Sequence, residues 1–173
     1  YQALLEEVWA SNILTNNGSM TQRLEAELTE MLGCASFTAV NNGTTAIQLA
    51  IKALELKGEI ITTPFTWIAT VGAIKAEGCT PRFCDIDPGT LNIDVDKIEA
   101  LIEGNTVAIM PVHVFGNPCD VERIEAIATK HKLKVIYDAA HALGTTFNGE
   151  SVLNAGDVSA VSLHATKLLN TAE

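Results

Sequence analysis

The stretch SLHATK (162–167) places a lysine five residues after a serine, directly beyond an apolar run. A lysine can form a Schiff base with an aldehyde when its amine reaches a ligand pocket and is partly desolvated, so that some of it is neutral. Taken alone, Lys167 is more typical of a solvated lysine after a strand. A catalytic role also requires a phosphate-binding turn, an acid that pairs with a ring nitrogen, and a flat aromatic side chain.

The turn NNGTT (41–45) is the candidate for the phosphate-binding turn. Backbone N–H groups at a helix start, together with the hydroxyls of Thr44 and Thr45 after Gly43, suit an anion. The turn lacks GxGxxG and the Lys-Ser/Thr of a P-loop, so neither a dinucleotide site nor a Walker site is indicated. An ordinary N-cap by Thr44 explains the turn equally well.

Two further segments supply the acid and the aromatic ring. YDAAH (137–141) ends an apolar run with Asp138, a carboxylate that needs a cation, a metal or several donors if it is buried. Helix capping by Asp138 is an alternative of similar weight. Trp67 follows another apolar run and offers a flat ring.

The elements that must position these residues follow an alternating pattern. Short β-branched runs separated by amphipathic stretches predict βαβ units, and runs such as VAIMPV are typical of strands buried on both faces. We therefore expect an α/β fold of three layers, a mostly parallel sheet with helices on both faces. The expected strands lie within 37–40, 59–63, 80–87, 106–112, 133–139 and 158–163, and the expected helices within 1–32, 45–56, 67–76, 94–103 and 119–132.

In such sheets, ligands bind beyond the carboxyl ends of the strands. This rule gathers Lys167, Asp138, Trp67 and the 41–45 turn at one edge. It also puts His113 and Asp85 near the pocket mouth, where we assign them no step. His164 is expected to pack against the core, and Ser19 with Gln22 has the spacing of a helix capping box.

Composition limits the function classes. Of 173 residues, 47% are hydrophobic and 18% charged, with 21 acidic residues against 11 basic ones and a net charge of −10, so a nucleic-acid partner is not expected. No stretch approaches the about 20 apolar residues of a membrane helix, and no signal peptide is recognisable. The four cysteines are Cys34, Cys79, Cys84 and Cys119. Their spacing is not that of a metal site, so we expect no metal. We expect them to be small core residues in a reducing compartment, which predicts a cytoplasmic protein.

Five motifs resemble those of the DegT/DnrJ/EryC1/StrS sugar aminotransferases, enzymes of pyridoxal phosphate (PLP) fold type I, in the same order and spacing. The resemblance begins at about residue 10. Members of that family are roughly twice this length, so it implies an N-terminal helical segment (1–32) and an incomplete PLP-binding large domain (33–173) without the small domain. The motifs are NNGTTAIQLAIKAL, TPFTWIATVGAIKAEGCTPRFCDID, PVHVFGNPCDVERIEAIA, YDAAHALGTTFNG and SLHATKLLNT.

The resemblance also implies a role for each candidate residue. Lys167 would form the Schiff base with PLP and later move a proton, and Asp138 would pair with the ring nitrogen. Trp67 would stack on the ring, and His141 would lie near the ring hydroxyl. Phosphate would be held by Ser162 and by the turn of Gly43, Thr44 and Thr45.

The implied reaction transfers an amino group, from glutamate in most of the family, to a keto-deoxysugar carried on a nucleotide. A lysine rather than a histidine at position 167 favours amine transfer over dehydration. The implied assembly is a homodimer. Two alternatives stay open at this point, namely a PLP-fold sensor or interaction module without turnover (or an inactive fragment of the enzyme), and an unrelated doubly wound nucleotide-binding domain.

Overall fold

The computed structural model describes residues 1–171, which divide into two compact units, Tyr1–Ala39 and a second beginning at Val40. The first unit contains helices α1 (Gln2–Ser11) and α2 (Ser19–Leu32). The expected capping box is wrong, because Gly18 is the N-cap and the Gln22 amide donates to the carbonyl of Asn17 instead (2.8 Å). Helix α2 ends at Gly33, whose φ of 60° suits a residue without a β-carbon.

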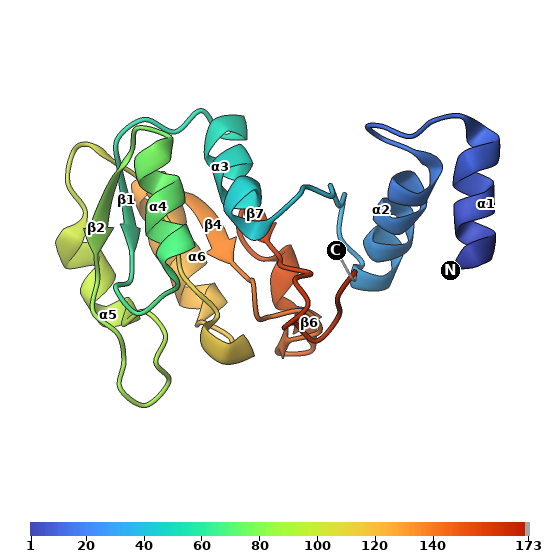
Figure 1. The fold of residues 1–173 in the computed structure, drawn as a ribbon. Helices are drawn as coiled ribbons and strands as arrows, with labels where there is room; N and C mark the ends of the chain where they lie inside the picture. The colour runs from blue at the N-terminus through green and yellow to red at the C-terminus, as the bar shows by residue number, and fades with distance from the viewer. Residues whose placement is uncertain (172–173) are drawn as a thin grey trace. The chain divides into compact units, whose positions relative to one another are not determined.

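The second unit is built on a five-stranded sheet in which all neighbouring strands are parallel. This arrangement, with helices on both faces (Figure 1), confirms the expected fold class. In spatial order the strands are β2 (Thr80–Phe83), β1 (Glu59–Thr62), β3 (Thr106–Ile109), β4 (Lys134–Asp138) and β7 (Val158–Ala160), and a separate hairpin is formed by β5 (Thr146–Phe147) and β6 (Glu150–Ser151).

The strand expected at 37–40 is wrong. These residues have no regular secondary structure, and within the described residues no strand pairs with them. The Ala39 N–H donates to the Glu25 carboxylate (2.7 Å), a contact that a ladder bond to another strand would replace. A short apolar run becomes a strand only when a neighbouring strand offers matching backbone groups.

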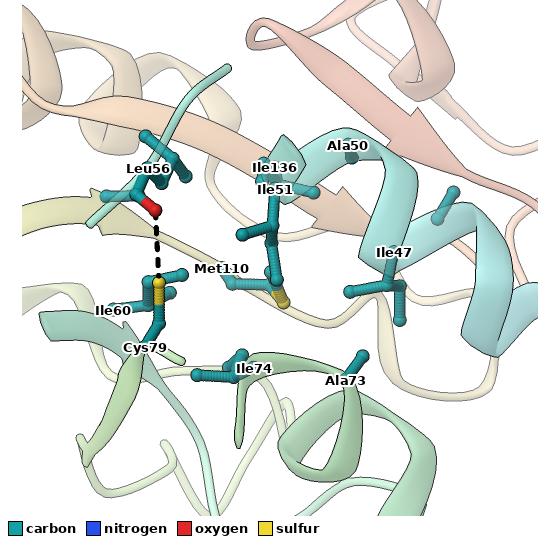
Figure 2. Packing of buried hydrophobic residues seen from close by; sticks show 12 residues of the cluster. Ile47, Ala50, Ile51, Leu56, Ile60, Ala73, Ile74, Cys79, Met110 and Ile136 are labelled. Atoms are coloured by element: carbon teal, nitrogen blue, oxygen red, sulfur yellow. Dashed lines mark hydrogen bonds between the residues drawn. The ribbon is translucent and has the colours of Figure 1, made fainter. Parts of the chain in front are cut away.

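One face of the sheet is covered by helices α3 (Gly43–Ala53) and α4 (Ile68–Ala76). Their apolar residues pack on the alternate strand residues that point to the same side, as Figure 2 shows for Ile51, Ile74 and Ile136. The Cys79 thiol donates to the carbonyl of Leu56 (3.4 Å) in this layer. This is the layer that carries the candidate site at its carboxyl edge.

The opposite face is covered by helices α5 (Val95–Ile98) and α6 (Val121–His131), with α6 behind the strands in Figure 1. Buried Cys84 and Cys119 belong to this second core, which with Cys79 confirms that three of the four cysteines are core residues. Three 3-10 turns complete the unit: η1 (Glu99–Leu101), η2 (Val114–Gly116) and η3 (Val152–Asn154). Across residues 1–171, no helix is long and apolar enough to cross a membrane.

Candidate active site

The order of the strands reverses direction within the sheet. From β1 the chain moves to β2 on one side, whereas β3, β4 and β7 follow on the other side. Ligands of open α/β sheets bind beside such a reversal of direction. Trp67 lies on the segment after β1, Asp138 is the last residue of β4, and Lys167 lies on the segment after β7.

Asp138 is the last residue of β4, and only 6% of its surface is exposed. Its neighbour in β4, Ile136, packs in the α3–α4 layer, so strand alternation directs Asp138 to that face. One carboxylate oxygen accepts a hydrogen bond from the Thr70 hydroxyl (2.6 Å), and the other accepts the Ala140 N–H (3.2 Å). A carboxylate offers about four acceptor positions, so lone pairs are left for a ligand.

Lys167 and Asp138 both act electrostatically on His141. The pKa of His141 is lowered by burial and next by the Lys167 ammonium, while the Asp138 carboxylate opposes the shift. Both charges therefore act on one imidazole ring. Lys167 is half-buried on the segment that follows β7. The structure thus brings the lysine and the acid to one edge of the sheet.

The turn at 41–45 begins α3 as expected, but Thr44 is not its N-cap. Asn42 occupies that position, and its side-chain oxygen accepts the Thr45 N–H (2.8 Å). Among the described residues, the N–H groups of Gly43 and Thr44 have no hydrogen-bond acceptor. A β-carbon added at Gly43 would lie 3.8 Å from the β-carbon of Ser162, so this helix start and the segment after β7 adjoin.

Aromatic side chains line the outer part of the site. Trp67 is the N-cap residue of α4 and is 78% exposed, so its ring faces remain available. Phe115, also largely exposed, stacks on His141 with 6.2 Å between ring centroids and 11° between planes. Phe65 meets Phe115 edge-on at 6.3 Å. We call Phe65, Trp67 and Phe115 the aromatic rim.

The expectation that His113 lies at the pocket mouth is wrong. His113 is fully buried and stacks on Tyr137 at 4.7 Å, within the core of the α5–α6 face and thus on the opposite side of the sheet from Asp138. Its Nδ1 accepts the Cys119 N–H (3.0 Å), and burial lowers its pKa to about 4. His113 therefore belongs to the fold rather than to the site.

Two further expectations need correction. Asp85 follows edge strand β2, separated from β4 by β1 and β3, and its carboxylate contacts Lys97 of α5 (3.4 Å). His164 does not pack against the core but is exposed, with its Nδ1 2.9 Å from the Thr166 hydroxyl. Among residues 1–171, neither side chain forms a hydrogen bond or an ion pair with a predicted site residue.

Sequence reasoning missed Thr70 and Asn92. Thr70 is fully buried against Asp138, and its four-residue spacing from Thr66 at the start of a helix was the available signal. Asn92, 3% exposed, holds the loop that carries Phe115, because its amide binds backbone groups of Val114, Asn117 and Pro118. No sequence signal connects Asn92 with a loop more than twenty residues away.

The sequence of the chain matches a known protein family and several of its members. The family model for the DegT/DnrJ/EryC1/StrS aminotransferases matches residues 1–173. A dTDP-4-amino-4,6-dideoxy-D-glucose transaminase from Shigella dysenteriae is 52% identical over 98% of this chain and 46% of its own length. A GDP-perosamine synthase from Caulobacter vibrioides is 37% identical over 98% of this chain and 45% of its own. The chain thus spans less than half the length of these relatives.

Solved structures agree with the family match. DesI, determined in the presence of its TDP-sugar product, has a TM-score of 0.94 at 36% identity over 98% of this chain and 43% of its own. NtdA from Bacillus subtilis, with bound cofactor PMP, has a TM-score of 0.89 at 34% identity over 98% of this chain and 38% of its own. These levels of identity and structural similarity extend the likeness from fold to family.

Proposed function

Because the chain belongs to the DegT/DnrJ/EryC1/StrS aminotransferase family, we propose that its full-length protein is a PLP-dependent sugar aminotransferase and that this chain carries the cofactor site. The observation that carries the proposal is the buried Asp138 carboxylate at the end of β4, together with the electrostatic effect of both Lys167 and Asp138 on His141. A buried acid and a half-buried lysine that act on the same imidazole are the residue types that Schiff-base chemistry on a pyridine ring requires.

The residues at this edge fit PLP. Asp138 retains acceptor positions beyond those used by Thr70 and Ala140, which a protonated ring nitrogen can occupy. The start of α3 offers N–H groups without internal acceptors beside Ser162, which suits a phosphate dianion. Exposed Trp67 can cover one face of the ring.

Each residue then has a defined task. Bound PLP supplies an aldehyde for an incoming amine and a ring that accepts the electron pair released at the substrate carbon. Lys167 Nζ would anchor the cofactor, and its amine would carry a proton to and from the substrate carbon. Asp138 holds the proton on the ring nitrogen, and His141 orients the ring hydroxyl. The Gly43–Thr45 turn and Ser162 hold the phosphate, while Trp67 excludes water from one ring face.

The amino acceptor that we propose is a keto-deoxysugar linked to a nucleotide, and the donor is glutamate. The sugars named for the Shigella and Caulobacter relatives are amino-deoxysugars, the products that amination of such keto-deoxysugars would give. We also propose a cytoplasmic homodimer. Free cysteines, three of the four buried, fit the cytoplasm. Helix α1 has no buried residue and exposes Leu5 and Trp9, which fits a surface that binds a partner. Sedimentation of the full-length protein tests the dimer.

Borohydride trapping of PLP tests the site. Adding PLP should produce the visible absorbance of a Schiff base, and reduction followed by peptide mapping should locate the cofactor on Lys167. Lys167→Ala should abolish both signals, whereas the exposed Lys57→Ala should keep them. Trapping on another lysine contradicts the proposal. Conversion of the bound cofactor to its amine form by glutamate then distinguishes an aminotransferase from a PLP-binding sensor.

A further inference from the structure

Among the described residues, the Thr70 hydroxyl forms the shortest hydrogen bond to the Asp138 carboxylate, and the two residues lie far apart in the sequence. The two residues are 68 positions apart in the chain, and the hydroxyl-to-carboxylate distance is 2.6 Å with Thr70 fully buried. A threonine in a helix commonly hydrogen-bonds to a carbonyl in the preceding turn. Here the Thr70 hydroxyl of α4 instead donates its hydrogen bond to Asp138 at the end of β4, so the bond holds the start of the helix against the acid.

The direction of the hydroxyl chain follows from counting protons. Thr70 has one hydroxyl proton, which goes to Asp138. The oxygen of Thr66 lies 2.6 Å from the oxygen of Thr70, and Thr66 must therefore donate in that contact. The resulting chain, Thr66 to Thr70 to Asp138, points all its donors toward the carboxylate. Hydrogen bonds to an ionised acceptor are shorter and stronger than neutral ones.

We propose that Thr70, oriented by Thr66, is a positioning residue that aims the Asp138 carboxylate at the ring nitrogen of the cofactor. The inference rests on the proposed function, because it concerns the same PLP site. Thr70 occupies one lone pair of Oδ2 and Ala140 one of Oδ1, which fixes the plane of the carboxylate and leaves its remaining lone pairs in set directions. The same first turn of α4 carries Trp67, whose carbonyl accepts the Thr70 N–H (3.1 Å), so one turn places both the acid and the stacking ring.

A cofactor analogue with C–H in place of the ring nitrogen tests this inference. Dissociation constants for PLP and for the analogue are measured by fluorescence titration of the full-length apoprotein. The parent protein should prefer PLP, because only PLP presents an N–H to Asp138. Thr70→Val should reduce this preference about tenfold, the lower end of the contribution of a hydrogen bond to a charged group. Thr70→Ser, which keeps the hydroxyl, should restore it, and Thr66→Val should have a smaller effect.

The control is Thr62→Val. Thr62 is also fully buried, but its hydroxyl donates to the carbonyl of Met110 (2.8 Å) and not to Asp138. Thr62→Val should leave the preference for PLP over the analogue unchanged. Equal weakening of both ligands by Thr70→Val would show a merely structural role and overturn the inference while leaving the proposed function intact. A parent protein that binds both ligands equally would overturn the pairing of Asp138 with the ring nitrogen and the inference with it.

Discussion

Replacement of Asn92 should lower the free energy of unfolding and make the loop that carries Phe115 less rigid. The Asn92 amide nitrogen donates to the carbonyls of Asn117 (3.1 Å) and Pro118 (3.0 Å), and its oxygen accepts the Val114 N–H (3.0 Å). Each such bond contributes about 1 kcal/mol net, so Asn92→Ala should lower the free energy of unfolding by about 3 kcal/mol.

Asn92→Asp separates hydrogen bonding from side-chain volume. The aspartate has nearly the same shape and can still accept the Val114 N–H, but it cannot donate to two carbonyl oxygens and instead repels them. Because the position is 3% exposed, water cannot take the place of the lost donors. We therefore expect Asn92→Asp to cost at least as much stability as Asn92→Ala at pH 7.

Urea denaturation followed by circular dichroism gives the two free energies. Asn117→Ala is the matched control, because the exposed Asn117 amide makes one bond, to the carbonyl of Thr90 (3.0 Å), and its loss should cost about 0.5 kcal/mol. An Asn92→Asp protein within about 1 kcal/mol of the parent would refute the reasoning, since three hydrogen bonds at a buried position would then contribute almost nothing.

Two further perturbations test other parts of the structure. The pKa of His113 is lowered to about 4, so as the pH falls the unfolded chain binds a proton near pH 6.5, whereas the native protein binds it only near pH 4. The free energy of unfolding should therefore decrease by about 3 kcal/mol as the pH is lowered from about 6.5 to about 4. His113→Phe should flatten this dependence in urea titrations and the exposed His164→Asn should not; equal slopes in both variants would contradict the assignment. Gly116→Ala should cost more stability than Gly144→Ala, because both glycines have φ near 80° but only at Gly116 would the new carbon lie 2.8 Å from a carbonyl, that of His141. We expect about 1 kcal/mol from backbone strain at either site and about 2 kcal/mol more at Gly116, and equal melting temperatures would argue against the close approach.

The sequence predicts Lys167 and Asp138 as site residues because the pattern around each of them is local. Asp138 ends one apolar run and Lys167 lies beyond another, and in a parallel sheet all carboxyl ends meet at one edge. The alternating pattern of strands and helices likewise predicted the layers, since burial on both faces requires near-continuous apolar strands. Five motifs in order indicate the family.

His113 shows why strand ends alone do not define a site. The rule places a residue at the correct edge of the sheet but leaves its face undetermined, because one residue more or less in the loop turns the side chain to the other side. The run at 37–40 illustrates the same limit for strands, since β-structure depends on a partner strand and not only on local preference.

What the sequence determined by itself is therefore the set of alternating elements and the chemical types gathered at their ends. What only the tertiary structure decided is which side chains meet. The Thr70 hydroxyl hydrogen-bonds to Asp138, 68 residues further along the chain, and the Asn92 amide hydrogen-bonds to a distant loop. Asp85 instead forms an ion pair with Lys97. These contacts depend on strand order, on the face of the sheet and on directional hydrogen bonds between segments far apart in the chain, none of which leaves a periodic pattern in the sequence.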